Sequence, residues 1–178
     1  MSTTKQITLP LLLLFVILCT EVAAQEAYKT AIGVRFGYPV SISAKHFLSE
    51  RMAAEAYIGT QGYSGYSTTN ISGAVQMDNP FDGNLGIDED TGLMSWYYGG
   101  GASIYFWSFD NFGFDIDSGG TSLGIQGYIG LEFTFDGAPI STSIDWIPTI
   151  FIGDAGGLSG FYGGYGTLSV RYVLNRGD

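Results

Sequence analysis

Residues able to carry out nucleophilic catalysis are few in this chain. His46 is the one histidine among 178 residues, and a serine nucleophile needs a histidine base that a third residue orients. In an extended segment, His46 and the nearby Ser43 would lie on opposite faces. The sequence therefore predicts no catalytic residue, and we expect a protein that is not an enzyme.

Two acidic segments could bind a hard cation. Carboxylate oxygens are ligands that calcium prefers, but neither segment has the spacing of an EF-hand loop. We interpret both as solvated surface loops, and we predict no metal site and no cofactor. The residues are Asp78, Asp82, Asp88, Glu89 and Asp90 in the first segment, and Asp110, Asp115 and Asp117 in the second.

Six other charged residues stand alone between apolar neighbours. Each lies in a segment where large apolar residues recur at every second position, and this period indicates a β-strand. The charges fall on the opposite face, together with Gly, Ser and Thr residues. Since three are basic and three are acidic, we predict that they pair with one another in a network: Arg35, Lys45, Glu55, Glu132, Asp145 and Arg171.

The same alternation extends through most of the chain. Between Leu123 and Phe135, apolar side chains alternate with Gly, Gln, Tyr, Glu and Thr. Helical periodicity of comparable quality does not occur, and Gly, Pro, Asn and Asp residues separate the segments. We predict an all-β fold, a closed antiparallel up-and-down β-barrel of eight strands. The predicted strands are residues 28–38, 41–48, 53–61, 65–76, 95–107, 122–135, 140–151 and 161–174.

The N-terminal residues have the features of a secretory signal peptide. Lys5 supplies a positive charge, Leu9 to Leu18 form an apolar run, and Val22-Ala23-Ala24 provide a small-residue cleavage site. The apolar run is shorter than the roughly 20 residues that a membrane-spanning helix needs. We predict a signal peptide at residues 1–24 and a single β-barrel domain at residues 25–178.

The composition of residues 25–178 excludes several classes of protein. Removing Lys5 and Glu21 with the signal peptide leaves six basic and sixteen acidic residues, a net charge of −10, which argues against nucleic acid as a partner. The one cysteine, Cys19, lies in the predicted signal peptide, so disulfides and thiol chemistry are excluded. No later stretch is long and apolar enough for a membrane-spanning helix, so only a closed barrel could cross a bilayer.

The charges within the strands favour one orientation of the barrel wall. A Lys or Arg that faces lipid at the bilayer midplane costs about 2–4 kcal/mol, so the apolar face would contact lipid and the charges would lie inside. Inward-facing glycines leave room for long side chains, and we predict a plugged lumen rather than an open pore. Aromatic residues near strand ends would lie at the membrane interfaces: Trp96, Tyr98, Trp107, Trp146 and Tyr172.

Six segments carry a family resemblance: residues 33–39, 45–48, 96–101, 130–135, 145–146 and 168–172. They resemble small outer-membrane β-barrel proteins of the Bacteroidota, similar in build to OmpA-like and OmpX-like barrels. The resemblance implies an eight-stranded barrel in the outer membrane of a Gram-negative cell and supplies no catalytic residues. Its partners would be outer-membrane lipid and the barrel-assembly machinery, and we expect a monomer. One departure is that residues 173–178 follow Tyr172, whereas outer-membrane strands usually end the chain on an aromatic residue.

Periodicity alone does not distinguish the inside of a barrel from its outside, so two other functions stay open. A soluble secreted barrel of the lipocalin type would line its interior with residues such as Ile125 and Leu131, around a small apolar ligand. A lipid-modifying outer-membrane enzyme would use His46 beside a serine. The balanced charges and the family resemblance favour a third function, an integral outer-membrane barrel with a structural or surface-binding role.

One predicted connection conflicts with the usual architecture of such barrels. With eight strands and both termini on the periplasmic side, the link between the fourth and fifth strands faces the periplasm. This link, residues 77–94, is long and acidic, yet long loops normally face the outside. Either the strand predicted at 65–76 is wrong, or the barrel departs from the usual asymmetry of its loops.

Overall fold

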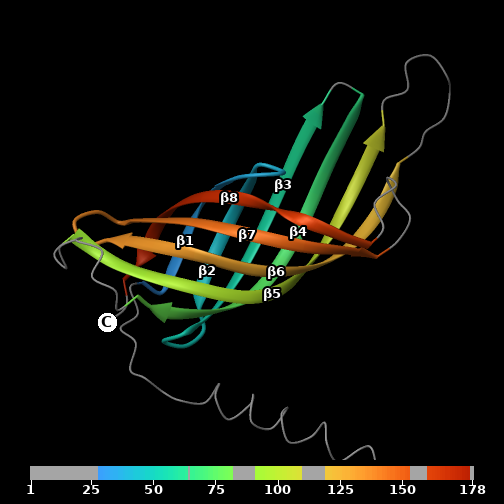
Figure 1. The fold of residues 1–178 in the computed structure, drawn as a ribbon. Helices are drawn as coiled ribbons and strands as arrows, with labels where there is room; N and C mark the ends of the chain where they lie inside the picture. The colour runs from blue at the N-terminus through green and yellow to red at the C-terminus, as the bar shows by residue number, and fades with distance from the viewer. Residues whose placement is uncertain (1–27, 64, 82–90, 110–118, 153–159, 177–178) are drawn as a thin grey trace, which may run out of the picture.

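The computed structural model describes residues 28–63, 65–81, 91–109, 119–152 and 160–176. In this part of the chain eight strands form a closed barrel, in which each strand is antiparallel to the next and β8 pairs with β1 (Figure 1). The predicted closed, antiparallel, eight-stranded all-β barrel is confirmed. The strands are β1 (Thr30–Phe36), β2 (Ser41–Phe47), β3 (Met52–Tyr63), β4 (Tyr66–Pro80), β5 (Gly92–Phe109), β6 (Gly120–Phe135), β7 (Ile140–Ile152) and β8 (Gly160–Asn175).

The signal peptide predicted at residues 1–24 lies outside the described residues. Among the residues that are described, no helix has the length and apolar character needed to cross a membrane.

Side chains alternate between the interior and the outer surface along the strands. In β2, Ser41, Ser43 and Lys45 are buried, whereas Ile42 and Ala44 are exposed. Strand pairing aligns the outward apolar residues of neighbouring strands into rows around the barrel. One such row consists of Ile42, Ile58, Ile71, Ile104 and Leu123, each the cross-strand neighbour of the next.

Strands β4 and β5 are longer than the sequence analysis predicts. The strand predicted at 65–76 is present and continues to Pro80, because Gln76 and Asp78 keep the alternation and remain buried. β5 begins at Gly92. The connection is therefore residues 81–91 rather than 77–94, and residues 82–90 lie outside the described residues. It lies at the end of the barrel where β1 starts and β8 ends, here called the inner end.

The barrel wall has unequal height at the opposite, outer end. β1 and β2 have 7 residues each, whereas β3, β4, β5 and β6 have between 12 and 18. Pairing of β2 with β3 stops at Ser41 and Gly59, but pairing of β3 with β4 continues to Tyr63 and Tyr66. The wall is therefore lower over β1 and β2, and β3 and β4 extend beyond them (Figure 1).

A bulge accommodates the proline within β7. Pro148 cannot donate a hydrogen bond to a neighbouring strand, and prolines inside sheets are confined to edges and bulges. The register between β7 and β8 shifts at this position, and Gly164 of β8 has a φ of +91°, which favours glycine. The Trp146 indole Nε1 donates to the Gly163 carbonyl at 3.0 Å, so a side chain supplies a hydrogen bond within the bulge.

Candidate functional site in the barrel interior

Every charged residue within the described strands has its side chain inside the barrel. Asp78 is the most exposed of them at 8%, and the others are at most 4% exposed. The interior therefore holds three basic and four acidic side chains. The seven residues are Arg35, Lys45, Glu55, Asp78, Glu132, Asp145 and Arg171.

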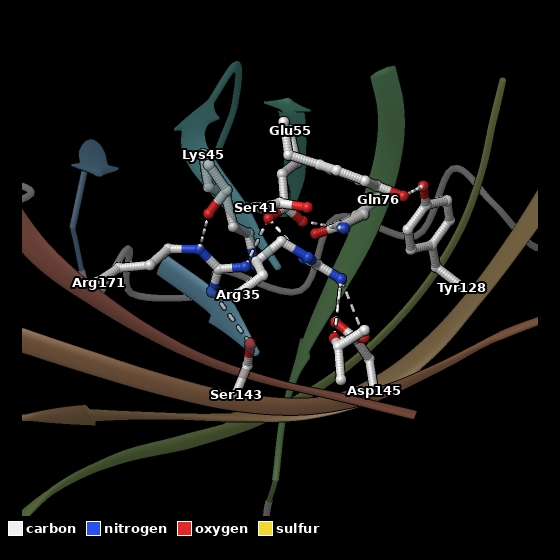
Figure 2. A network of polar contacts seen from close by, with 12 residues as sticks. Arg35, Ser41, Lys45, Glu55, Gln76, Tyr128, Ser143, Asp145 and Arg171 are labelled. Atoms are coloured by element: carbon white, nitrogen blue, oxygen red, sulfur yellow. Dashed lines mark hydrogen bonds and ion pairs between the residues drawn. The ribbon is translucent and has the colours of Figure 1, made fainter. Parts of the chain in front are cut away.

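Glu55 lies between two guanidinium groups. Arg35 Nη1 and Arg171 Nη2 each donate to Glu55 Oε1 at 2.6 Å, and Gln76 Nε2 donates to Glu55 Oε2 at 2.7 Å. Side chains from β1, β3, β4 and β8 meet at this carboxylate (Figure 2). Hydrogen bonds between ionised groups are among the strongest in proteins, so this carboxylate links four strands across the interior.

Arg35 also connects β1 to β7, two strands away around the barrel. Its Nη2 donates to both carboxylate oxygens of Asp145 at 3.0 Å. The Tyr97 hydroxyl donates to Asp145 Oδ2 at 2.5 Å, and the Thr167 hydroxyl donates to Oδ1. The Arg35 guanidinium lies 4.8 Å from the centroid of the Tyr57 ring, a cation–π contact. Asp145 is therefore paired with a charge and bonded to two further donors.

Lys45 pairs with a second carboxylate centre. Its Nζ donates to Glu132 Oε2 at 2.5 Å and to Asp78 Oδ2 at 3.2 Å. The Tyr28 hydroxyl donates to Glu132 Oε1 at 2.6 Å, and the Ser141 hydroxyl donates to the same oxygen. Burial raises the pKa of the Tyr28 hydroxyl well above its usual range, so this hydroxyl stays protonated and remains a donor.

Arg171 links the two carboxylate centres. Besides Glu55, its Nη1 lies 4.0 Å from Glu132 Oε1 and donates to Ser143 Oγ at 3.0 Å. Its Nε donates to Ser43 Oγ at 3.3 Å. The structure thus brings the six residues of the predicted network into one continuous set of polar contacts, part of which is drawn in Figure 2.

Asp78 belongs to this network although the sequence analysis assigned it to an acidic surface loop. That assignment is wrong, because β4 extends past Asp78 and turns its carboxylate toward Lys45. The sequence contains a signal for this position. Ala74, Gln76 and Asp78 continue the inward period of the strand, and all three are buried.

An apolar cluster lies at the inner end of the interior. Tyr28 and Phe47 contact each other edge to face, with ring centroids 5.1 Å apart. The cluster comes from the start of β1 and β3 and from the end of β2 and β8. The cluster therefore lies at the inner end of the interior, beside the charged network. Its members are Tyr28, Ala31, Phe47, Ala53 and Val173.

Neutral side chains line the outer half of the interior. Gln126 is central to them, since its Nε2 donates to the hydroxyls of Tyr105 and Tyr165 at 3.2 and 3.3 Å. Its Oε1 accepts from the hydroxyls of Tyr57 and Tyr128 at 3.2 and 2.8 Å. The charged network and this tyrosine cluster therefore divide the interior into a charged inner half and a neutral outer half.

Four of the five predicted interfacial aromatic residues face outward, and one does not. Trp96, Tyr98, Trp146 and Tyr172 are between 37% and 56% exposed. Trp107 is only 8% exposed, and its ring stacks on Tyr105 at a centroid distance of 5.9 Å. The prediction for Trp107 is wrong because this residue has the inward parity of β5, which its position near the strand end does not change.

The residues considered for catalysis do not come together in the described structure. His46 is exposed on the outer surface and bonds to Thr30 through Nδ1 at 2.8 Å, whereas Ser43 is buried inside. Residues 120–124 have the spacing Gly-x-Ser-x-Gly, but they lie within β6 rather than at a strand-to-helix turn. Ser122 there accepts a hydrogen bond from the Trp107 indole at 3.2 Å.

The acidic segments are only partly described. Apart from Asp78, the carboxylates considered as calcium ligands, at positions 82, 88–90, 110, 115 and 117, lie outside the described residues. Within the described part of the chain, no group of three or more His, Cys, Asp or Glu residues is arranged to hold a metal ion.

Comparisons with family models, with curated proteins and with solved structures find no match to this chain. Two features of the barrel itself bear on its function. They are the distribution of charge between the two faces of the wall and the hydrogen bonding of the interior.

Proposed function

We propose that this chain is an integral outer-membrane β-barrel with a plugged, ion-paired lumen, and that its role is structural or surface-binding rather than catalytic. One observation carries the proposal. All seven Asp, Glu, Lys and Arg residues of the described strands are buried inside, while large apolar side chains cover the outer wall. A wall of this kind is suited to contact with lipid, since each charge would otherwise be costly in the hydrocarbon region.

The length of the apolar band supports this role. On the outer surface of β4, apolar residues and one glycine lie between Thr69 and Asn79. A separation of ten residues at about 3.3 Å each, on a strand tilted by roughly 40°, gives a height of about 25 Å. That height equals the apolar band of about 25 Å that outer-membrane barrels present to lipid.

A soluble barrel of the lipocalin type is less consistent with the same side chains. In water, the outer wall would expose residues such as Ile42 at 68% and Phe161 at 70%. Each apolar side chain left in water forfeits about 1.5–3 kcal/mol of burial free energy. The interior would meanwhile enclose charged groups rather than an apolar ligand. The lipocalin-like binder therefore remains the alternative that the first experiment must exclude.

The proposed location follows from the chain's N-terminus and from the family resemblance. A signal peptide at residues 1–24 would direct export, and the barrel-assembly machinery would insert the barrel into the outer membrane of a Gram-negative cell. Within the membrane we propose a monomer whose partner is lipid. The filled interior implies that the barrel does not act as an open porin.

The test is the localisation and the electrophoretic behaviour of the expressed protein. We expect recovery in the outer-membrane fraction, and we expect the band of an unboiled sample to shift on boiling, as stable membrane barrels unfold only on heating. A porin of known location serves as the positive control and a periplasmic enzyme as the negative control. Recovery as a soluble periplasmic protein without a shift would overturn the proposal and favour the lipocalin-like alternative.

A further inference from the structure

Three polar atoms that lack a hydrogen-bond partner among the described residues lie together near the outer end of β3 and β4. They are Gln61 Oε1, Thr68 Oγ1 and Asn70 Oδ1. Gln61 and Thr68 are direct cross-strand neighbours, and Asn70 is the next inward-facing residue of β4. Thr68 and Asn70 are 1% and 0% exposed. Native structures rarely leave buried polar atoms unbonded, because this is unfavourable, so three together indicate a shared partner.

An aromatic surface adjoins these atoms on β5. Tyr105 is the cross-strand neighbour of Asn70, and Trp107 is the cross-strand neighbour of Thr68. The two rings are stacked, with an interplanar angle of 16°. The neutral, hydrogen-bonding atoms of β3 and β4 thus lie beside two stacked aromatic rings.

The chemistry of the three atoms limits what could bind them. Amide oxygens only accept hydrogen bonds, and the Thr68 hydroxyl can donate or accept, so the partner must supply several donors. An anion would be repelled by the acceptor oxygens. A cation would be buried without a countercharge, since the four carboxylates of the described strands belong to the network of the inner half.

We propose that Gln61, Thr68 and Asn70, with the stacked rings of Tyr105 and Trp107, form a binding site for an uncharged, polyhydroxylated ligand of the carbohydrate type. Such a molecule supplies several hydroxyl donors and has an apolar face that packs on aromatic rings. Mouths of β-barrels are common positions for ligand sites, and the low wall over β1 and β2 lies next to β3. The site goes beyond the proposed membrane role, since it lies inside the barrel whatever surrounds the outer wall.

The test uses glucose as the neutral probe and two charged molecules of similar size, gluconate and glucosamine. Because Thr68 and Asn70 are closed to solvent, a ligand can reach them only if the neighbouring rings move, and the fluorescence of Trp107 reports that movement. The Trp107 signal is obtained as the difference between the wild-type barrel and Trp107→Phe. We expect a saturable change and a higher unfolding temperature with glucose, and binding at least tenfold weaker for both charged probes.

Two variants remove the unpartnered atoms while keeping similar volume, Thr68→Val and Asn70→Leu. We expect each to weaken the response to glucose at least tenfold. We also expect Thr68→Val to raise the unfolding temperature of the ligand-free barrel, because an unsatisfied polar atom is gone. Asn70→Leu has no such expected gain, since it also removes the hydrogen bond from Asn70 Nδ2 to Ser72 Oγ at 3.2 Å. The matched control is Thr69→Val, on the same strand but facing outward, which should keep the wild-type response. Thr68→Val is the milder change and remains informative if Asn70→Leu does not fold.

Several outcomes would overturn the site. A wild-type barrel that responds to none of the probes, or equally to all three, has no such specificity. A response that persists in both variants places the binding elsewhere. If ordered water alone satisfies the three atoms, Thr68→Val lowers the unfolding temperature and glucose has no effect. None of these outcomes depends on the fractionation result, so a failure of this site is distinguishable from a failure of the membrane assignment.

Discussion

Arg35 and Arg171 donate to the same oxygen of Glu55, each at 2.6 Å. Two guanidinium groups of equal charge can lie this close only because the carboxylate is between them. Replacing Glu55 by Gln keeps the shape of the side chain but leaves the two cations without their shared countercharge. Breaking a buried ion pair in this way costs about 3–5 kcal/mol, and we expect Glu55→Gln to destabilise the barrel by that amount.

The measurement is a urea titration of the purified barrel in lipid vesicles, with the folded fraction read from electrophoretic mobility. Glu50→Gln is the matched control, because Glu50 is exposed in the connection between β2 and β3 and should change the stability little. Equal stability of the two variants would show that the interior charges do not stabilise the barrel.

Much of this interior follows from parity in the sequence. A strand of period two places every second residue on the same face, so Arg35, Glu55 and Arg171 can be assigned to one face without a structure. Sequence cannot say which strands bring those residues to the same height, because that depends on the register of eight strands around the barrel. The contact between Arg35 on β1 and Asp145 on β7 is of this kind.

Position along a strand is a poorer guide than parity to the face on which a residue lies. The place of Trp107 near a strand end predicts a position at the membrane interface, yet its parity places it inside. The acidic residues that follow Asp78 predict a loop, although the parity of Asp78 agrees with that of Gln76. The unpartnered atoms of Gln61, Thr68 and Asn70 have no sequence signal, since hydrogen-bond satisfaction depends on the packed structure.

A double-mutant cycle on Lys45 and Glu132 separates the energy of their ion pair from the energy of burying the two charged side chains. We expect Lys45→Met to be destabilising, because it leaves Glu132 and Asp78 buried without their cation. Adding Glu132→Gln removes one of those carboxylates, so the double variant should be more stable than the sum of the two single changes predicts, by roughly 0.5–3 kcal/mol. The same urea titration applied to the four proteins of the cycle gives this coupling. Strict additivity would mean that the 2.5 Å contact contributes no net pairing energy.

Trp146 gives a prediction about the bulge opposite Pro148. Its indole donates to the Gly163 carbonyl at 3.0 Å, and in lipid no water replaces a lost donor. Trp146→Phe keeps an outward aromatic ring but leaves the carbonyl unsatisfied, which we expect to cost about 1–3 kcal/mol. Trp96→Phe is the control, since Trp96 is also outward-facing and stacks on Tyr98. A role of Trp146 limited to the membrane interface would give the two variants similar losses.

The outer wall provides a test of what surrounds the barrel. Val75 lies near the middle of the outward apolar residues of β4 and is 49% exposed, and Ser67 is exposed eight residues nearer the outer end of the same strand. In a membrane, Val75→Lys should cost about 2–4 kcal/mol and Ser67→Lys about 0–1 kcal/mol, because the penalty for a cation falls from the midplane toward the interface. Folding yields into lipid vesicles and urea titrations of the two variants measure this difference. In a barrel surrounded by water, both lysines would be solvated and both variants would keep the wild-type stability, so the depth dependence itself separates the membrane barrel from the soluble one.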